Sequence, residues 1–480
     1  MAEQSQIILV MIIYLSVLIG WGLWQGRNVK SQKDYAIAGR NLPGWAAALS
    51  ERATGESSWA LLGLPGFAYA VGLTSLWTAV GCVTGIISAW WFIAFRLRDD
   101  AEKYDVHTFT DFIAHRHGPV EKPIRIVSSL VIVFFFFFYV GAQFLGGGKT
   151  LHALFGLNPA TGMLITACII VPYTVYGGFR SVVYTDVIQS IIMIITLIIG
   201  PVAGILYLKN NPGLFAGSIS EALKMSGTSY SSLIGGVSGF TAGITIMGGF
   251  SWFFGYLGGQ PQLSMRFMAI RNAGQAKRAR NIGIIWTLFA YMGALYIGWI
   301  GLAIFGPHGL SDPETVMPRV MLTVFPPAFA AILITGAIAA MISTADSLLI
   351  LSATELSENL IKLKTQTGLQ YSRIITALLA VIALTLAYIT PSNLIYTLVG
   401  YVWAGIGGTF SAVILLTLFW KRFHGRAVVV TIITGMVFTI IWISSGLETL
   451  ITARVMTFVV ATITALISTL YIKPKQITIT

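Results

Sequence analysis

The sequence contains few charged residues and almost no cysteine. Only 10% of its 480 residues are charged and 56% are hydrophobic, whereas about 25% of the residues in a soluble domain are charged. This composition excludes an ordinary soluble protein and indicates a polytopic membrane protein. Cys82 and Cys168 both fall within apolar runs. We therefore expect two small core residues, with neither a disulfide framework nor a thiol metal site.

The sequence also lacks long polar segments and catalytic motifs. Only short segments separate the apolar runs, and the chain stops soon after the last run, at KPKQITIT. We therefore expect one transmembrane domain over residues 1–480, with no appended enzymatic or signalling domain. The six histidines lie mostly in loops or at span ends and form no Ser/His/Asp or metal-ligand motif. The sequence predicts neither an enzyme nor a cofactor other than a coupling ion.

Apolar runs long enough to cross a bilayer, about 20 residues each, recur along the whole chain. We count 13 of them and predict an all-α fold with 13 transmembrane helices. The first run is not a cleavable signal peptide, because it lacks a basic start and a small-residue cleavage site. The predicted spans are 6–26, 43–70, 74–95, 124–149, 156–177, 183–208, 236–258, 281–305, 321–350, 371–389, 393–419, 427–446 and 453–472.

Lysine and arginine are distributed very unevenly between the two sides that these spans define. If the N-terminus lies outside, nearly all of the 30 basic residues fall in the inner loops and the C-terminal tail. This bias predicts the N-out, C-in orientation of a multi-pass plasma membrane protein, as in a bacterial inner membrane. It also accounts for the net charge of +12 without a nucleic acid partner. The exceptions are Arg52, within a span, and the outer residues Lys149, Lys209, Lys224, Arg319 and Arg454.

One polar stretch, SERATGESSW at residues 50–59, lies inside the second span. Its charges, Glu51, Arg52 and Glu56, are costly there, since a charge at mid-membrane costs roughly 2.5–3.5 kcal/mol. One interpretation is an internal ion pair, because Arg52 and Glu56 are helical neighbours four residues apart. The other is a helix break around Gly55, whose freed carbonyl oxygens line a cavity. Such oxygens suit Na⁺, so the second interpretation predicts a cation site.

A second polar stretch, AAMISTADSLL at residues 339–349, lies in the ninth span. Its small and hydroxyl residues recur at i, i+3, i+4 and i+7 on one helical face, with Asp346 beside that face. The face is either a packing stripe or a set of oxygen ligands, and Asp346 favours the ligands. We expect two mid-bilayer kinks, around Gly55 and Ser343, to hold a dehydrated cation between them. The residues of the face are Ala340, Ser343, Thr344 and Ser347.

A set of aromatic residues occurs near these polar stretches. Aromatic residues in spans pack against one another more often than they line a binding site. Here the segment GGFSWFFGYLGGQP has glycine-rich flanks and an expected helix end at Gln260-Pro261, which favour a cavity. The residues expected around that cavity are Trp59, Tyr139, Gln143, Trp252 and Tyr256.

Several segments between residues 34 and 408 carry a family resemblance. They are DYAIAGRNLPGWAAALS, SSWALLGLPG, GGFRSVVYTDVIQSIIM, GYLGGQPQLSMRFMAIRNA, AAMISTADSLLILSATELSENL and YVWAGIGG. Together they resemble the sodium:solute symporter family, most closely its sodium/proline symporter branch. The resemblance implies a LeuT-like core of two inverted five-helix repeats, here 43–208 and 236–419. An extra first helix, 6–26, would precede the repeats, and two C-terminal helices, 427–472, would follow them.

The resemblance also implies ligand positions. The main sodium site would take the backbone carbonyls of Ala53 and Glu56 from the second span. The ninth span would add the carbonyl of Ala340 and the hydroxyls of Ser343 and Thr344. A second sodium, held by some family members, would match Asp186, Ser343, Asp346 and Ser347. The substrate positions would be Ser57, Trp59, Tyr139, Trp252, Tyr256 and Pro261, and Glu56 and Gln143 complete our predicted substrate set.

Two departures from the family pattern affect these positions. The proline branch resembles S-x-x-x-x-D-M-S in the second span, whereas this chain has Gly55 at the aspartate position and a carboxylate one place later, at Glu56. A one-residue move turns a helical side chain by about 100°, so we expect Glu56 to face the substrate or a neighbouring helix. Glu51 and Arg52 replace small residues, and one extra residue precedes Pro261. A substrate other than proline therefore stays open.

We expect a sodium-coupled secondary active symporter that imports a small solute, most simply proline or a related amino acid, by alternating access. The alternatives are proton coupling through Glu56, and another family substrate such as a carboxylate, pantothenate or a sugar. A membrane sensor without transport is a remote alternative. The expected partners are Na⁺, the small-molecule substrate and the lipid bilayer, and no oligomeric state is predicted.

Overall fold

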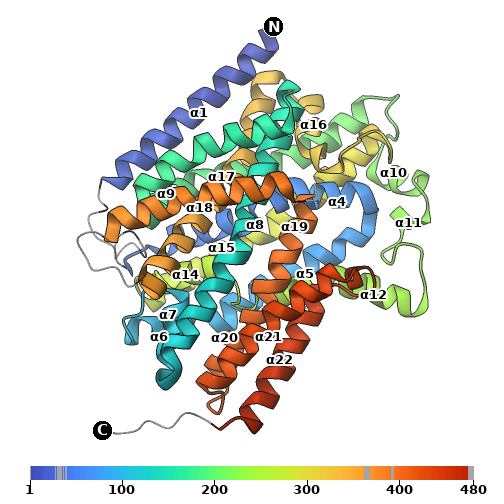
Figure 1. Cartoon of the computed structure of the whole chain (residues 1–480). Coiled ribbons are helices and arrows are strands. Elements are labelled where there is room, and N and C mark those ends of the chain that lie inside the picture. The colour runs from blue at the N-terminus through green and yellow to red at the C-terminus, as the bar shows by residue number, and fades with distance from the viewer. Residues whose placement is uncertain are drawn as a thin grey trace.

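Long helices coincide with the apolar runs of the sequence and assemble side by side (Figure 1). In this computed structural model the residues described are 2–27, 29, 35, 37, 40–361, 368–390 and 394–473. Within those ranges the only β contact is a parallel bridge between Leu42 and Ile270. The all-α fold predicted from the sequence is confirmed.

The helices differ in length, because some cross the bundle without interruption while others are broken at glycine, serine or proline. The uninterrupted ones are α1 (Ala2–Gly26), α8 (Glu121–Phe155), α15 (Ala273–Phe305), α17 (Pro327–Thr354), α18 (Gly368–Ile389), α21 (Gly425–Ser444) and α22 (Ala453–Tyr471). The remaining helices and helical turns are α3 (Gly44–Ser58), η2 (Trp59–Gly63), α4 (Leu64–Val71), η3 (Gly72–Ser75), α5 (Leu76–Ser88), η4 (Ala89–Ile93), α6 (Ala94–Lys103), α7 (Phe109–Arg116), η5 (Gly118–Val120), α9 (Pro159–Asn210), α10 (Ile219–Met225), α11 (Thr228–Ser231), α12 (Gly239–Phe250), α13 (Trp252–Tyr256), α14 (Pro261–Met268), η6 (Pro313–Thr315), α16 (Val316–Val324), η7 (Glu355–Ile361), α19 (Ile395–Val402), η8 (Trp403–Gly408), α20 (Thr409–Phe419) and η9 (Leu447–Thr449).

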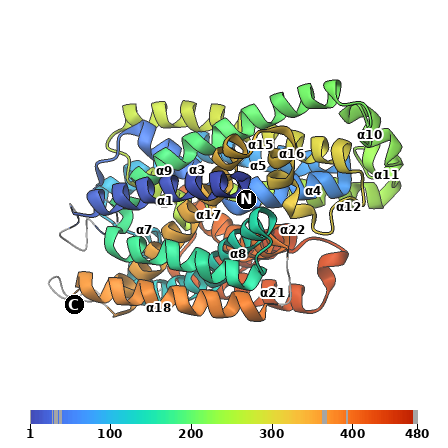
Figure 2. The ribbon, with the colours of Figure 1, turned by 90° about the horizontal axis from the view of Figure 1, so that it is seen from above.

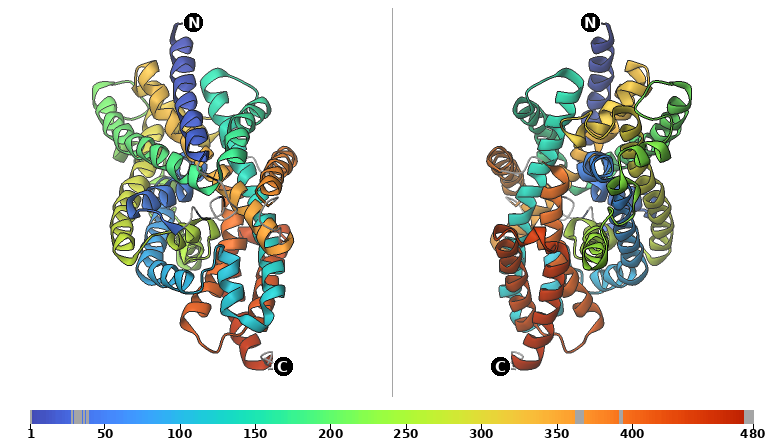
Figure 3. Two further views of the ribbon diagram at one scale, coloured as in Figure 1. Left: turned by 90° about the vertical axis from the view of Figure 1, so that its left-hand side faces the viewer. Right: turned by 90° about the vertical axis from the view of Figure 1, so that its right-hand side faces the viewer.

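The most deeply buried candidate span in the described part of the chain is the one that contains α17. Helices α3, α8 and α9 all pack against α17. Helix α1 runs along the outside of the bundle against α9 and α17, while α21 and α22 pair at the other end (Figures 1 and 3). Seen from above, α15 and α18 lie on opposite sides of the molecule (Figure 2). The centre of the fold is therefore the contact between α3 and α17, the helices that carry the two polar stretches.

The described residues contain 10 helical segments long and apolar enough to cross a membrane, and a bent pair, Gly239–Tyr256 with Pro261–Met268, makes up to 11. Two of the segments, Gly44–Lys103 and Pro159–Asn210, have 60 and 52 residues, although one crossing takes about 20. Both contain a glycine with positive φ, Gly72 in the first and Gly178 in the second. If each crosses twice, the fold agrees with the 13 predicted spans. That count and the N-out orientation stay predictions.

Two predicted helix boundaries are wrong, and proline is the reason in both cases. The predicted span 321–350 is divided, because α16 ends at Val324 and α17 begins at Pro327. The expected helix end at Gln260-Pro261 is instead a helix start. The preceding helix ends at Tyr256, and Pro261 opens α14 after a bend of 41°. Proline suits the first position of a helix, where no amide hydrogen is needed.

The structure confirms one of the two cysteine predictions. Cys82 is buried, whereas Cys168 is exposed on α9. The core position predicted for Cys168 is wrong, because an apolar run in a membrane protein can face lipid as well as the protein interior. Both cysteines are free thiols.

Gly178 forms the turn within α9, between the predicted spans 156–177 and 183–208. Its φ and ψ are 61° and −175°, while the residues around it are helical. A Cβ atom at this position would lie 2.7 Å from Cδ2 of Tyr35. Only glycine adopts this backbone conformation without strain, so Gly178 fixes the angle between the two halves of α9.

Gly178→Ala is expected to lower the thermal unfolding temperature of the purified protein in detergent by several degrees. A side chain at positive φ costs about 1–2 kcal/mol, and Tyr35 would also have to move. Gly20→Ala is the control, since a Cβ at Gly20 would meet no atom within 4 Å. Equal unfolding temperatures for the two variants would contradict this prediction.

Candidate functional site

Helix α3 breaks at Ser57, two residues after the position expected from the sequence. Ser57 has φ 48° and ψ −167°, which is unusual for a residue other than glycine. The chain then continues as the π-helical turn η2. All residues from Ser50 to Gly63 are buried, so the break lies within the protein interior. A broken second span is confirmed, with Ser57 rather than Gly55 as its centre.

Side chains from neighbouring elements bond the backbone groups around the break. The N–H of Ser58 donates to Oε1 of Gln143 at 3.0 Å. The carbonyl of Thr54 accepts the Thr344 hydroxyl at 3.0 Å, and the carbonyl of Gly55 accepts the Trp59 indole N–H at 3.3 Å. Backbone polar groups at membrane depth require such partners. Gln143, predicted to bind substrate, therefore also supports the backbone of the break.

Helix α17 passes through the second polar stretch without a kink, so the break expected around Ser343 is wrong. Its hydroxyl residues bond across to α3, and they do not unwind their own helix. Oγ1 of Thr54 lies 3.1 Å from Oγ of Ser347 and 3.5 Å from Oγ of Ser343. The predicted oxygen face of α17 thus points at the broken helix. The positions predicted for the main sodium site, all buried at this α3–α17 contact, are Ala53, Glu56, Ala340, Ser343 and Thr344.

A guanidinium that the sequence placed in an inner loop lies among the residues predicted for a second cation. Arg266 on α14 is 1% exposed, and its Nη2 atom lies 3.2 Å from Oδ2 of Asp186 and 2.5 Å from Oγ of Ser347. Nη2 also donates to Thr54 at 2.9 Å. Asp346 accepts the Tyr173 hydroxyl at 2.7 Å. Two carboxylates and one guanidinium therefore share this region.

Sequence reasoning missed Arg266 because α14 was assigned to the loop 259–280. Every residue of α14 is buried. The available signal was the proline at its start followed by the apolar residues Leu263 and Phe267, which match an amphipathic helix better than a loop. Arg266 therefore belongs to the interior charges and not to the loop charges that indicate orientation.

The three charges of SERATGESSW form one buried network, here called the charge triad: Glu51, Arg52 and Glu56. Nε of Arg52 donates to Glu51 at 2.5 Å, and Nη2 donates to its other carboxylate oxygen. Nη1 of Arg52 donates to Oε1 of Glu56 at 2.9 Å and to Thr287 at 3.1 Å. None of the three side chains is more than 2% exposed. The ion pair considered from the sequence is confirmed, with Glu51 as a second partner.

Aromatic side chains from several helices meet beside the charge triad in what we call the aromatic cluster. The indoles of Trp59 and Trp252 stack with centroids 4.3 Å apart and planes 8° apart. The Trp252 indole N–H donates to the Tyr396 hydroxyl at 3.2 Å. Two side chains that were predicted to surround the substrate thus contact each other directly. The cluster comprises Trp59, Tyr139, Trp252, Tyr256, Tyr291, Tyr396 and Trp403.

Three members of this cluster were not predicted: Tyr291, Tyr396 and Trp403. Tyr291 lies in α15, which has no break that would mark a site in sequence. Trp403 lies in YVWAGIGG, which forms the π-helical turn η8. Gly255 leaves space for the Trp403 indole, and Gly407 of the same motif lets the backbones of η8 and α13 approach closely. That motif was the available signal for Trp403. Of the remaining predicted substrate positions, Ser57 is the break itself and Pro261 lies at the start of α14.

Charged side chains hold Tyr396 in place on the predicted outer side. Glu314 in η6 is 2% exposed and accepts the backbone N–H groups of Ile395 and Tyr396 at 2.9 and 2.8 Å. Lys149 on α8 donates to Glu314 at 2.7 Å. The Tyr396 ring also stacks on Phe67, with centroids 4.3 Å apart. We call Lys149, Glu314 and the first turn of α19 the outer latch.

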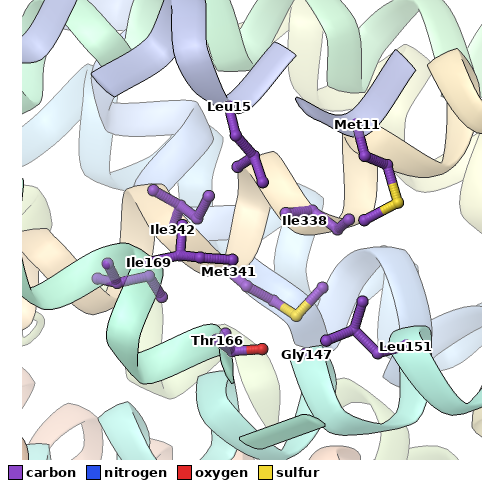
Figure 4. Close-up of a pocket in the computed structure, with 10 residues that line it drawn as sticks. Met11, Leu15, Gly147, Leu151, Thr166, Ile169, Ile338, Met341 and Ile342 are labelled. Atoms are coloured by element: carbon purple, nitrogen blue, oxygen red, sulfur yellow. The ribbon is translucent and has the colours of Figure 1, made fainter. Parts of the chain in front are cut away.

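A separate cavity lies between α1, α8, α9 and α17 (Figure 4). Ile338, Met341 and Ile342 line it from α17, and by helical spacing they occupy the face opposite the hydroxyl residues. Its one hydroxyl, that of Thr166, is already bonded to the Gly162 carbonyl at 2.8 Å. This cavity is a packing space beneath α1 and contributes nothing to the polar site.

Comparison with known proteins agrees with this geometry. The model of the sodium:solute symporter family matches residues 35–435. The high-affinity proline transporter PutP of Bacillus subtilis (strain 168) is 32% identical over 90% of this chain and 90% of its own length. The osmoregulated proline transporter OpuE of the same strain is 31% identical over 90% of this chain and 87% of its own. The sodium/proline symporter of Staphylococcus aureus (strain JH9) is 30% identical over 90% of this chain and 85% of its own length.

Solved structures with the same fold are also transporters. A Na⁺-coupled sialic acid symporter in a substrate-bound, outward-open state superimposes with a TM-score of 0.79, covering 98% of this chain and 99% of its own, at 17% identity. Mhp1, a nucleobase-cation-symport-1 family transporter in a closed conformation, superimposes with a TM-score of 0.56 at 16% identity. The match covers 91% of this chain and 92% of the Mhp1 chain. The LeuT-like fold is therefore confirmed.

Glu314→Gln is expected to increase the reaction of Cys82 with a membrane-impermeant thiol reagent several-fold. Cys82 is fully buried beside Tyr291. The substitution removes one of the two carboxylates that bind Lys149, which keeps its contact with Asp312 at 2.8 Å, and it also weakens the bonds to the first turn of α19. With Cys168 replaced by serine, Cys82 is the sole thiol, because the chain has two cysteines. The rate of labelling from the outer side measures the opening of the latch.

Glu221→Gln is the control for this experiment. Glu221 is an exposed carboxylate in α10 that accepts only the local backbone N–H of Gly217, at 2.9 Å, in the described part of the chain. An equal labelling rate in the Glu314 and Glu221 variants would contradict a closing role for the latch.

Proposed function

The chain belongs to the sodium:solute symporter family, and we propose that it imports proline or a closely related amino acid together with Na⁺. It is a multi-pass plasma membrane transporter and not an enzyme. The family and its fold support sodium as the coupling ion. The identity of the substrate is our proposal, and it rests on the names of the relatives together with the site described above.

One observation carries the proposal: a helix broken at Ser57 lies against the oxygen face of an intact α17. A dehydrated alkali ion requires several oxygen ligands in a space without water. Thr344 donates its hydrogen to Thr54, which leaves the lone pairs of the Thr344 hydroxyl for a cation. We propose that this oxygen and Ser343 Oγ bind Na⁺ together with the carbonyls of Ala53, Glu56 and Ala340.

A second cation position is supported by charge. Asp186 and Asp346 supply two negative charges against the single positive charge of Arg266. Oδ1 of each aspartate accepts no hydrogen bond from the described residues. A monovalent cation coordinated by these aspartates with Ser343 and Ser347 would neutralise the group, because buried charges require a partner.

We propose that the substrate occupies the aromatic cluster, between the main sodium position and the outer latch. Ser57, Trp59, Tyr139, Gln143, Trp252, Tyr256 and Pro261, with Glu56, form the proposed substrate set. Repeats 43–208 and 236–419 would rock against each other around this point. Sodium binding at the α3–α17 contact would fix the broken helix and thereby complete the substrate site. The membrane potential then contributes about 2.3 kcal/mol per charge for each 100 mV.

A different amino acid is the second candidate substrate. Glu51 and Arg52 of the charge triad occupy positions where the family pattern has small residues, and the triad borders the aromatic cluster. A changed charge arrangement so close to the cluster is the observation that favours altered specificity over proline itself.

Purified protein in proteoliposomes is expected to accumulate proline above its external concentration when Na⁺ is present outside, and not when K⁺ replaces it. A negative interior potential should increase the accumulation, because each cycle carries net positive charge inward. The measurement is uptake of radiolabelled proline, with a panel of other amino acids as competitors. Accumulation that is equal in Na⁺ and K⁺ would refute sodium coupling.

Thr344→Ala is expected to weaken the apparent Na⁺ affinity of uptake at least about tenfold, because one lost ligand of a buried ion costs on the order of 1.5–3 kcal/mol. Thr335→Ala is the matched control on the same helix, since Thr335 is also buried and, among the described residues, its hydroxyl bonds only to the Ile332 carbonyl of its own helix. The sodium dependence of the uptake rate provides both values. Equal effects of the two substitutions on the apparent Na⁺ affinity would show that Thr344 does not bind the sodium ion.

A further inference from the structure

The charge triad has one more negative charge than positive charge. Glu51 and Glu56 are both fully buried carboxylates, and Arg52 is the single cation between them. No other Lys or Arg among the described residues forms an ion pair with either glutamate. An uncompensated buried charge is strongly unfavourable, so the triad calls for another positive charge, either a bound proton or a cationic ligand.

The hydrogen bonds place that excess charge on Glu56. Glu51 uses both of its carboxylate oxygens on Arg52. Glu56 accepts a hydrogen bond from Arg52 through Oε1 only. Its other oxygen, Oε2, is buried and accepts no hydrogen bond from the described residues. One fully buried carboxylate oxygen therefore has no donor at hydrogen-bond distance, although the Tyr291 hydroxyl lies near the carboxylate.

Gly55 makes this arrangement possible. A Cβ atom at position 55 would lie 3.3 Å from Nη2 of Arg52 and 3.3 Å from Leu263. A larger residue there would require the guanidinium or Leu263 to shift by a few tenths of an ångström. Gly55 therefore leaves space for the guanidinium that bonds Glu51 and Glu56.

The side chain of Glu56 lies beside the aromatic cluster. Tyr291 and Tyr256 are close to Glu56, and their hydroxyls lie 3.0 Å from each other. Tyr291 in turn contacts Trp59, with ring centroids 5.9 Å apart. The carboxylate of Glu56 thus lies at the polar edge of the aromatic cluster.

We propose that the carboxylate of Glu56 binds the cationic nitrogen of the transported solute, while the backbone carbonyl of the same residue coordinates the sodium ion. This inference rests on the proposed function and adds the substrate class: a small solute with a protonated amine and an apolar body. Arg52 acts as a positioning residue, since it neutralises Glu51 and holds Oε1 of Glu56. Aromatic faces attract cations as well, so the cluster and the carboxylate favour the same ligand.

A purely structural triad would be a weaker explanation. Glu51 alone satisfies the charge of Arg52 through both carboxylate oxygens, so a second buried carboxylate adds a desolvation cost with only one further bond. A ligand ammonium would balance that charge whenever substrate is bound. Anionic solutes such as simple carboxylates, and uncharged sugars, would leave it unbalanced.

The test compares proline with tetrahydrofuran-2-carboxylate, in which a ring oxygen replaces the NH₂⁺ group. Their affinities are measured by thermal stabilisation of the purified protein in Na⁺ and by competition with proline uptake. Wild-type protein should prefer proline by roughly 10- to 100-fold, the range expected for one hydrogen bond to a charged group. Glu56→Gln should lose most of that preference by weakening proline binding, with little change for the analogue.

Glu355→Gln is the matched control, because Glu355 is an equally buried glutamate bonded to Ser129 and Asn359 on the other half of the molecule. Its preference for proline over the analogue should equal that of the wild type. If Glu56→Gln does not fold, Glu56→Asp is used instead, because it keeps the charge on a shorter side chain. It should weaken the binding of proline more than the binding of the analogue. Equal losses for the two ligands, or an unchanged preference in Glu56→Gln, would overturn the inference.

The two proposals fail in different ways. If wild-type protein shows no sodium-dependent uptake of proline or of any other amino acid in the panel, the proposed function is wrong. If uptake is normal and the preference for the amine does not depend on Glu56, the function stands and the assignment of Glu56 is wrong.

Discussion

A backbone that breaks inside a membrane must find partners for its N–H and C=O groups among side chains, because lipid offers none. At Ser57 these partners are the amide of Gln143, the hydroxyl of Thr344 and the indole of Trp59. The break therefore ties α8 and α17 to the first half of the second span. A cation bound by the Thr344 hydroxyl and the neighbouring carbonyls of Ala53 and Glu56 would add to these contacts and hold the three elements together. Coupling of ion and solute follows from this shared dependence, and it must be reciprocal.

The interior charges repeat one pattern at two places. In each place two carboxylates lie near one guanidinium, although Arg52 bonds both of its carboxylates and Arg266 bonds only Asp186. At least one carboxylate oxygen in each place lacks a hydrogen bond from the described residues. A deficit of one positive charge is costly in the absence of ligand, and a monovalent cation from solution removes it. A transporter can use such a deficit to favour a loaded state over an empty one. The two groups are Glu51, Arg52 and Glu56 near the aromatic cluster, and Asp186, Arg266 and Asp346 below the sodium position.

The sequence was sufficient to predict the membrane class, the broken second span and the oxygen face of α17, because charge density and helical spacing are local properties. It misplaced the break by two residues, since Gly55 marks where a helix is weak and not where its partners lie. It wrongly predicted a kink at Ser343, because a serine can bond across to another helix as well as to its own backbone. Arg266 was missed for a related reason: an arginine after a proline looks like a loop residue until the packing of α14 is known. Tyr291 had no local signal, since only the tertiary fold brings it to Glu56.

The parallel contact between Trp59 and Trp252 gives the protein an internal optical reporter. Two indoles stacked this closely share their electronic transitions, and they must separate if a solute enters between them. The near-ultraviolet signal of the pair would therefore change when solute enters. Since the chain has 13 tryptophans, the difference between the wild type and a variant that lacks Trp252 would isolate the contribution of the pair.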